Sequence, residues 1–241
     1  MQKADANLVH PSPDLYEGGA VELVVFDCDG VLIDSEIIAC EVEAEELSKI
    51  GYKVSCADVA ERFVGMPSNK VYEVVERELG HALPQGFESR LYKKILERYR
   101  TDLREIGGAN EVISLLDTKK CVASSSEPAK LALGLIEAGL FELLYPFIYS
   151  TTLVARGKPH PDLFEYSAKS MGVSASECLV VEDSVAGVTA ARAAGMRVVG
   201  FYGGSHCSPL HSEKLYAAGA CAVISDLRAI LQVVTTSASS T

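Results

Sequence analysis

The sequence lacks any uninterrupted apolar run of the roughly 18–20 residues that a membrane-spanning helix needs, so we do not expect a membrane protein. Residues 1–20 are polar, contain proline and lack the apolar core of a signal peptide. The seven cysteines are odd in number and include no C-x-x-C pair, a pattern that suits a reducing compartment better than a disulfide framework. We therefore expect a cytoplasmic protein.

Positive charge is also scarce, because 22 Lys and Arg stand against 33 Asp and Glu, which gives a net charge of −11. Such a surface repels nucleic acid and anionic membranes, so neither is expected as a partner. It would also repel a phosphorylated substrate, so any phosphate site must supply its own positive charge. A hydrophobic fraction of 48% is ordinary for a globular protein that buries a full core.

Apolar runs and helical stretches alternate along most of the chain. The run at 21–26 predicts a buried strand, and further strands are expected at 120–124, 146–150, 178–182, 197–201 and 221–224. Helical periodicity separates the later strands near 108–117, 127–138, 161–171 and 184–194. Regular β-α alternation predicts an α/β fold with a doubly wound parallel sheet and a Rossmann-like core.

The segment 35–104 differs, because it is charged, helix-periodic and free of convincing strands. We expect four helices there, the second opened by a capping box of Ser55 and Asp58. The segment is thus predicted to be an all-α insert in a core made of 19–34 and 105–232. Residues 1–18 and 233–241 are predicted to be flexible tails.

Polar residues gather where the first four predicted strands end. They are Asp27-Cys28-Asp29-Gly30, Ser124-Ser125-Ser126, Lys158 in the third loop, and Glu182-Asp183. Because ligand sites of parallel sheets lie at the carboxyl ends of the strands, we expect these clusters to converge. Carboxylates bind Mg²⁺ through oxygen, a lysine neutralises phosphate charge, and an aspartate can attack phosphorus. The pattern indicates phosphoryl transfer.

Each cluster taken alone has a simpler interpretation, as a turn, a helix N-cap or a solvated lysine. Cys28 invites a thiol nucleophile, but strand alternation points it to the opposite face and no histidine is near it in sequence. His206, Cys207 and His211 have the composition of a zinc site, yet they lie in a Gly-Gly-Ser loop without a partner cluster. We interpret that segment as a loop.

Taken together, the order and spacing of the motifs are specific. They are Phe26-Asp27-x-Asp29-Gly30-Val31-Leu32-x-Asp34-Ser35, Ala123-Ser124, Lys158-Pro-x-Pro-Asp162, and Val181-Glu182-Asp183-Ser184-x-x-Gly187. Over about 21–232 the chain resembles the haloacid dehalogenase-like hydrolase superfamily, and within it the branch of β-phosphoglucomutase and small-sugar phosphatases.

The resemblance implies a role for each matching residue. Asp27 would attack phosphorus and form an aspartyl-phosphate, and Asp29 would protonate the leaving group and then activate water. Ser124 and Lys158 would hold the phosphoryl oxygens, with the backbone N–H of Ser125 beside them. The implied ligands of Mg²⁺ are the carboxylates of Asp27, Glu182 and Asp183 and the main-chain carbonyl of Asp29. The helical insert would be a cap that closes over the site.

The cap departs from the mutase pattern. Val64 and Ser68 flank Gly65 where the mutase has Lys and Arg, and Ala39 stands where it has His. These losses weigh against mutase activity.

We therefore expect a phosphatase, monomeric or weakly dimeric, that hydrolyses a small phosphate ester such as a sugar or sugar-acid phosphate. Arg62, Asn69 and Lys70 could bind that substrate, although an exposed cap face explains them equally well. A mutase and a non-catalytic binding protein are the alternatives. A dehalogenase is less expected, because that branch lacks the second aspartate, which is present here as Asp29.

Overall fold

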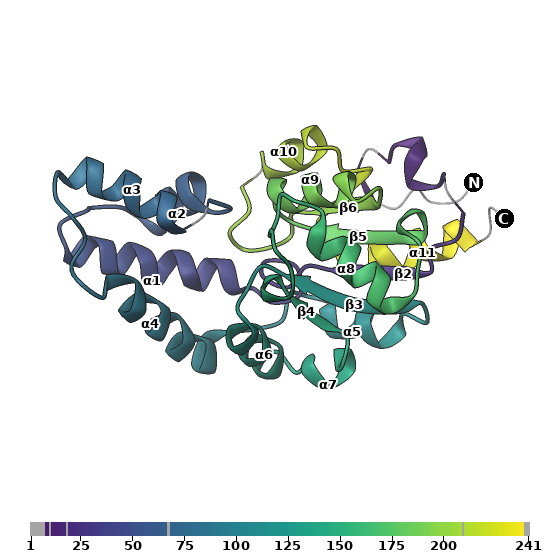
Figure 1. The fold of residues 1–241 in the computed structure, drawn as a ribbon, viewed down its shortest axis with the longest axis horizontal. Coiled ribbons are helices and arrows are strands. Elements are labelled where there is room, and N and C mark those ends of the chain that lie inside the picture. The colour runs from purple at the N-terminus through teal and green to yellow at the C-terminus, as the bar shows by residue number, and fades with distance from the viewer. Residues whose placement is uncertain (1–7, 10, 18, 67, 209, 239–241) are drawn as a thin grey trace.

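The chain is described by a computed structural model that covers residues 8–238 except 10, 18, 67 and 209. Its centre is a seven-stranded sheet in the order β1-β7-β6-β5-β2-β3-β4 (Figure 1). The strands are β1 (Leu8–Val9), β2 (Leu23–Phe26), β3 (Lys119–Ser124), β4 (Ile148–Ser150), β5 (Cys178–Glu182), β6 (Arg197–Phe201) and β7 (Ala222–Ile224). All six predicted strands are present and parallel, and only β1, which was not predicted, runs antiparallel.

Helices cover both faces of the sheet because β2 presents apolar side chains to both. Leu23 and Val25 are buried with residues of α8 (Asp162–Met171), α9 (Val185–Ala193) and α10 (His211–Ala217). Val24 and Phe26 are buried with residues of α5 (Ala109–Leu115), α6 (Pro128–Glu137), α7 (Phe141–Leu144) and α11 (Ala229–Ala238). A strand enclosed on both sides must be apolar at every position, which explains the continuous run. The α/β prediction is confirmed.

The first four of the five helices between β2 and β3 lie together at one end of the molecule (Figure 1). They are α1 (Ser35–Lys49), α2 (Cys56–Phe63), α3 (Ser68–Leu79) and α4 (Phe87–Asp102). The predicted capping box at the start of α2 is present, with Ser55 and Asp58 bonded reciprocally. Figure 1 shows α2 ending and α3 beginning on the side that faces the sheet, as a cap would require.

The described residues near each end form regular structure, which differs from the tails expected at 1–18 and 233–241. Leu15 is fully buried in a short 3₁₀ helix, and β1 pairs with β7. The Arg197 guanidinium donates to the carbonyl of Gly19 at 2.9 Å. At the other end, α11 extends through most of the predicted tail and buries Val233. A few apolar side chains anchor these polar segments to the sheet edge and its helices. The outermost residues, 1–7 and 239–241, lie outside the described residues.

Candidate active site

The site forms where the order of the strands changes direction. β2 lies between β3 and β5, and Phe26 pairs with Val122 on one side and Val181 on the other. Asp27, which follows Phe26, is therefore level with the end of β3 and with Glu182 at the end of β5. Such a switch point is the usual place for a ligand in an open α/β sheet. The predicted convergence of the β2 and β5 clusters is observed.

Lys158 joins these clusters from the loop after β4. Its Nζ atom lies 2.7 Å from Oδ1 of Asp27, 2.6 Å from Oε1 of Glu182 and 3.0 Å from the carbonyl oxygen of Ala123. The side chain is only 4% exposed. Burial by itself lowers the pKa of the ammonium group, but Asp27 and Glu182 raise that pKa above its usual value. Lys158 therefore supplies the local positive charge that the acidic composition requires.

Asp27, Glu182 and Asp183 form a buried acidic cluster whose ligand oxygens all lie within 4.8 Å of one another. Burial raises the pKa of Asp27 well above its ordinary value, Lys158 opposes this, and the two neighbouring carboxylates raise it further. A cation among these oxygens would relieve the repulsion. An all-oxygen donor set of this kind fits Mg²⁺.

The backbone leaves little room beside these carboxylates. A Cβ atom on Gly30, whose φ is +78°, would lie 1.9 Å from Oδ2 of Asp183. A Cβ atom on Gly187 would lie 1.7 Å from Oε1 of Glu182. The other oxygen of Glu182 accepts hydrogen bonds from the N–H and hydroxyl of Ser184 at 2.8 and 2.9 Å. Glu182 is thus fixed in place, and its observed contacts orient Lys158.

Asp29 is held by a second network. Its carboxylate accepts hydrogen bonds from Ser126 at 2.6 Å and Ser35 at 2.7 Å, and Lys130 Nζ lies 3.2 Å away. The hydroxyl of Tyr99 on α4 lies 3.3 Å from the same carboxylate. Burial raises the pKa of Asp29, but Lys130 and the two serines lower it to about 2. Asp29 is therefore ionised at neutral pH in this state and can accept a proton.

Lys130, Ser35 and Tyr99 were not predicted as site residues, and Ser126 was predicted only as a member of the serine cluster after β3. Lys130 could have been noticed in the sequence, because it lies in the first turn of α6, where the helix dipole disfavours a cation. A lysine at that position directly after a serine cluster indicates an anionic partner. Tyr99 left no comparable signal, because only the packing of α4 brings it to Asp29.

The predicted phosphate-binding serines differ in exposure. Ser124 is fully buried, its hydroxyl accepts a hydrogen bond from the N–H of Ser126 at 3.0 Å, and it lies 3.5 Å from Asp29. Ser125 is exposed at the end of β3. Cys28 is completely buried, and burial raises the pKa of its thiol well above the usual value, as expected of a structural cysteine.

The three predicted cap residues are exposed. Arg62 donates to Glu78 at 2.7 Å and to the hydroxyl of Tyr52 at 2.9 Å. Lys70 pairs with Glu73 at 2.8 Å within α3. These contacts fit an exposed cap face, and substrate binding by Arg62, Asn69 and Lys70 stays a prediction.

The loop between β6 and α10 also reaches the acidic cluster. Nε2 of His206 lies 3.2 Å from Oδ2 of Asp183, and Nε2 of His211 lies 2.5 Å from the main-chain oxygen of Asp183. Burial lowers the pKa of His206, but Asp183 and Cys207 raise it to about 11. No partner cluster for this loop was evident in the sequence, and the fold supplies one at Asp183.

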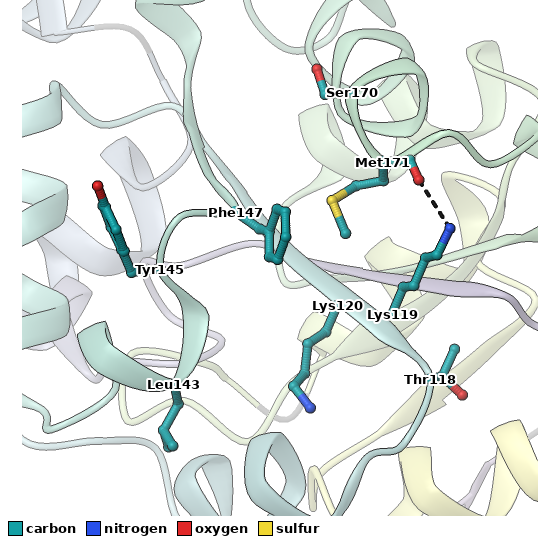
Figure 2. Close-up of a pocket in the computed structure, with 8 residues that line it drawn as sticks. All are labelled: Thr118, Lys119, Lys120, Leu143, Tyr145, Phe147, Ser170 and Met171. Carbon is teal, nitrogen blue, oxygen red and sulfur yellow. Dashed lines mark hydrogen bonds between the residues drawn. The ribbon is translucent and has the colours of Figure 1, made fainter.

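A pocket lies at the opposite end of β3 from Ser124. Its lining, drawn in Figure 2, is Thr118, Lys119, Lys120, Leu143, Tyr145, Phe147, Ser170 and Met171. Nζ of Lys119 donates to the carbonyl of Met171 at 3.2 Å, and Nζ of Lys120 donates to that of Leu116 at 2.7 Å. Because none of these lining residues is acidic, we place the candidate active site at the acidic cluster instead.

Comparison with known proteins agrees with this geometry. A family model described as haloacid dehalogenase-like hydrolase matches residues 21–195. The chain belongs to this family of hydrolases. Its resemblance to the branch of small-sugar phosphatases and β-phosphoglucomutase is also confirmed. None of the described helices is long and apolar enough to cross a membrane.

Individual relatives cover most of the chain. The 6-phosphogluconate phosphatase of Escherichia coli K12 is 29% identical over 81% of this chain and 89% of its own length. A solved haloacid dehalogenase-like protein of unknown function from Agrobacterium tumefaciens is 42% identical, with a TM-score of 0.83 over 89% of this chain and 97% of that one. A hydrolase of the family from Deinococcus radiodurans, solved with bound phosphate and sodium, is 32% identical, with a TM-score of 0.78 over 92% and 97% of the two chains.

Proposed function

We propose that this enzyme, a phosphoric monoester hydrolase, is a Mg²⁺-dependent phosphatase that acts on a small sugar or sugar-acid phosphate through an aspartyl-phosphate at Asp27. The position of the Lys158 ammonium group, between Asp27 and Glu182, is the main support. It places a fixed cation beside the proposed nucleophile at a strand switch point. The similarity to a 6-phosphogluconate phosphatase supports the class of substrate.

Within the described part of the chain, one buried cluster offers three carboxylates to the metal. Asp27 and Asp183, with the main-chain carbonyl of Asp29 and with Glu182, would hold Mg²⁺, which would neutralise charge on the phosphoryl group and keep Asp27 ionised. Lys158 would contact the same phosphoryl oxygens from the other side. Ser124 and the N–H of Ser125 would complete their binding site.

In the first half-reaction, an Oδ atom of Asp27 attacks phosphorus, and the bond from phosphorus to the ester oxygen breaks. Asp29 gives its proton to that leaving oxygen. The pKa of Asp29 must therefore rise from about 2 in the structure, and an approaching phosphate dianion would raise it by like-charge repulsion. In the second half-reaction, Asp29 takes a proton from water, which cleaves the aspartyl-phosphate.

Phosphatase activity is favoured over mutase activity by the composition of the cap. A mutase must hold a bisphosphorylated intermediate, and this cap has Val64 and Ser68 where the mutase branch has cationic residues. Each missing charge-assisted hydrogen bond would be worth about 1.5–3 kcal/mol. Transfer to water should therefore outrun transfer to a second hydroxyl. The expected products from a hexose 1-phosphate are free sugar and inorganic phosphate.

The roles of the two aspartates can be tested with beryllofluoride, which mimics the aspartyl-phosphate. With Mg²⁺ it should raise the melting temperature of the wild type and of Asp29→Asn, but not of Asp27→Asn. Asp29→Asn should lose about 10²–10⁴-fold in turnover, the usual contribution of general acid–base catalysis. Cys28→Ser is the matched control and should remain active. An active Asp27→Asn beside an inactive Cys28→Ser would reverse the assignment.

The metal requirement and the reaction type need separate measurements. Hydrolysis of an aryl phosphate should stop in excess chelator, return with Mg²⁺ and be inhibited competitively by Ca²⁺, whose looser coordination misplaces the nucleophile. No phosphate release under any condition would favour a non-catalytic binding protein. Conversion of a hexose 1-phosphate to the 6-phosphate without release of phosphate would establish a mutase.

A further inference from the structure

His206, Cys207 and His211 form a cluster that the proposed phosphatase reaction does not use. They lie between β6 and the first turn of α10, and one ligand atom from each lies within 4.8 Å of the others. Two imidazoles and a thiol are ligands that zinc prefers, whereas Mg²⁺ prefers oxygen. The cluster therefore differs in chemistry from the acidic cluster beside it.

The distances around His206 agree with a tetrahedral site. Nε2 of His206 lies 3.4 Å from Sγ of Cys207 and 3.2 Å from Oδ2 of Asp183. Around a tetrahedral Zn²⁺ at ordinary bond lengths, a nitrogen and a sulfur ligand are about 3.6 Å apart, and a nitrogen and an oxygen ligand are about 3.4 Å apart. Small movements of these side chains would bring the atoms to those separations.

The His206 ring is confined so that its Nε2 atom points toward the other candidate ligands. Its side chain is only 2% exposed, and its Nδ1 atom is buried without a hydrogen-bond partner among the described residues. A Cβ atom on Gly204 or Gly30 would lie 2.9 Å from the ring, so backbone without side chains packs against it. Every polar contact that the described residues give the ring is made through Nε2, which faces Cys207 and Asp183.

We propose that His206, Cys207 and His211 bind a borderline-soft divalent ion such as Zn²⁺, with the carboxylate of Asp183 as a fourth ligand. Binding converts the Cys207 thiol to a thiolate, and its proton passes to the solvent. Asp183 also belongs to the proposed Mg²⁺ site, so the two ions compete for one carboxylate. Zn²⁺ bound here inhibits the phosphatase by withdrawing Asp183. The binding site is independent of the proposed function, and only the inhibition rests on it.

Cobalt provides a direct test of the site, because a Co²⁺–thiolate bond gives a charge-transfer band in the near ultraviolet. Metal-free wild-type protein titrated with Co²⁺ should develop this band together with the strong visible bands of tetrahedral cobalt, and one equivalent of Zn²⁺ should abolish both. Excess Mg²⁺ should not abolish the thiolate band, because Mg²⁺ does not displace the nitrogen and sulfur ligands.

Variants assign the ligands. Cys207→Ser should lose the near-ultraviolet band, and Cys207→Ser, His206→Ala and His211→Ala should each weaken Zn²⁺ binding in equilibrium dialysis by more than about 100-fold, since even indirect supports of a metal site are worth 10–100-fold. Cys56→Ser and His160→Ala are the matched controls and should bind Zn²⁺ like the wild type. Circular dichroism confirms that each variant is folded, and the wild-type spectrum tests the site even if a variant is not.

The activity measurement is made separately in each protein, as the ratio of rates with and without Zn²⁺ at constant Mg²⁺. Zn²⁺ should inhibit the wild type and the two controls much more than Cys207→Ser. If no phosphatase activity is found while the cobalt band is present, the proposed function fails and the metal site stands. A wild-type cobalt spectrum without a thiolate band would overturn the site. So would Zn²⁺ binding that is lost in Asp183→Asn but unchanged in Cys207→Ser.

Discussion

Replacing Lys158 by methionine should destabilise the folded protein far more than the loss of an ordinary ion pair. The substitution keeps most of the apolar stem but leaves Asp27 and Glu182 buried without the ammonium group that lies 2.7 and 2.6 Å from them. At an effective dielectric constant of 20, each contact is worth about 6 kcal/mol of Coulomb attraction, most of which offsets desolvation of the charges. Removing one partner of a buried pair typically costs about 3–5 kcal/mol.

For a protein of this length, that loss corresponds to a fall of roughly 6–20 °C in melting temperature. The free energy of unfolding should be measured by urea titration in excess chelator. Arg156→Met is the matched control, because Arg156 pairs with Asp162 at 2.8 Å but is 59% exposed. An exposed pair of this kind contributes about 0–1 kcal/mol.

The loss in Lys158→Met should also depend on pH and on Mg²⁺. Burial raises the pKa of Asp27 even in the wild type, where the charge of Lys158 opposes the rise. Without Lys158, the pKa of Asp27 should be higher still. A carboxyl group whose pKa is higher in the folded than in the unfolded protein makes its full contribution to the free energy of unfolding at pH values below its unfolded pKa. That contribution is lost as the pH rises through the folded pKa. The deficit should therefore be larger at pH 8 than at pH 5, and Mg²⁺ should reduce it. A loss no greater than that of Arg156→Met at pH 8 would refute the reasoning.

Three other substitutions test particular contacts. Gly187→Ala would place a Cβ atom 1.7 Å from Glu182, so we expect a loss of about 1–3 kcal/mol in urea unfolding and at least a tenfold fall in kcat. Burial raises the pKa of Glu43 to about 7, so the wild type becomes less stable as pH rises through 7. The free energy of unfolding of Glu43→Gln should therefore exceed that of the wild type by about 1–3 kcal/mol at pH 8 and equal it at pH 4. An equal effect at both pH values would contradict this. Lys130→Met should raise the pKa of Asp29 from about 2 and, because Asp29 donates a proton in the first half-reaction, move the basic limb of the kcat/KM profile to higher pH; an unchanged profile would exclude this role.

The sequence by itself determined the sheet and the residues at the ends of its strands. Continuous apolar runs such as 23–26 specify strands buried on both faces, and the polar residues that follow must then lie at one edge. For this reason the approach of Lys158 to Asp27 and Glu182 could be predicted without coordinates. The capping box of Ser55 and Asp58 was equally local, because its hydrogen bonds span only three residues.

Only the tertiary structure decided the surroundings of Asp29 and Asp183. Lys130 and Tyr99 reach Asp29 from helices that are distant in sequence, and their approach depends on how α4 and α6 pack. His206 reaches Asp183 because β6 lies beside β5, so that the loop after β6 passes next to the end of β5. Periodicity describes which face of an element is apolar, but it does not specify which distant loop covers the end of a strand. That choice is made by packing, and here it decides both the pKa of Asp29 and the neighbours of Asp183.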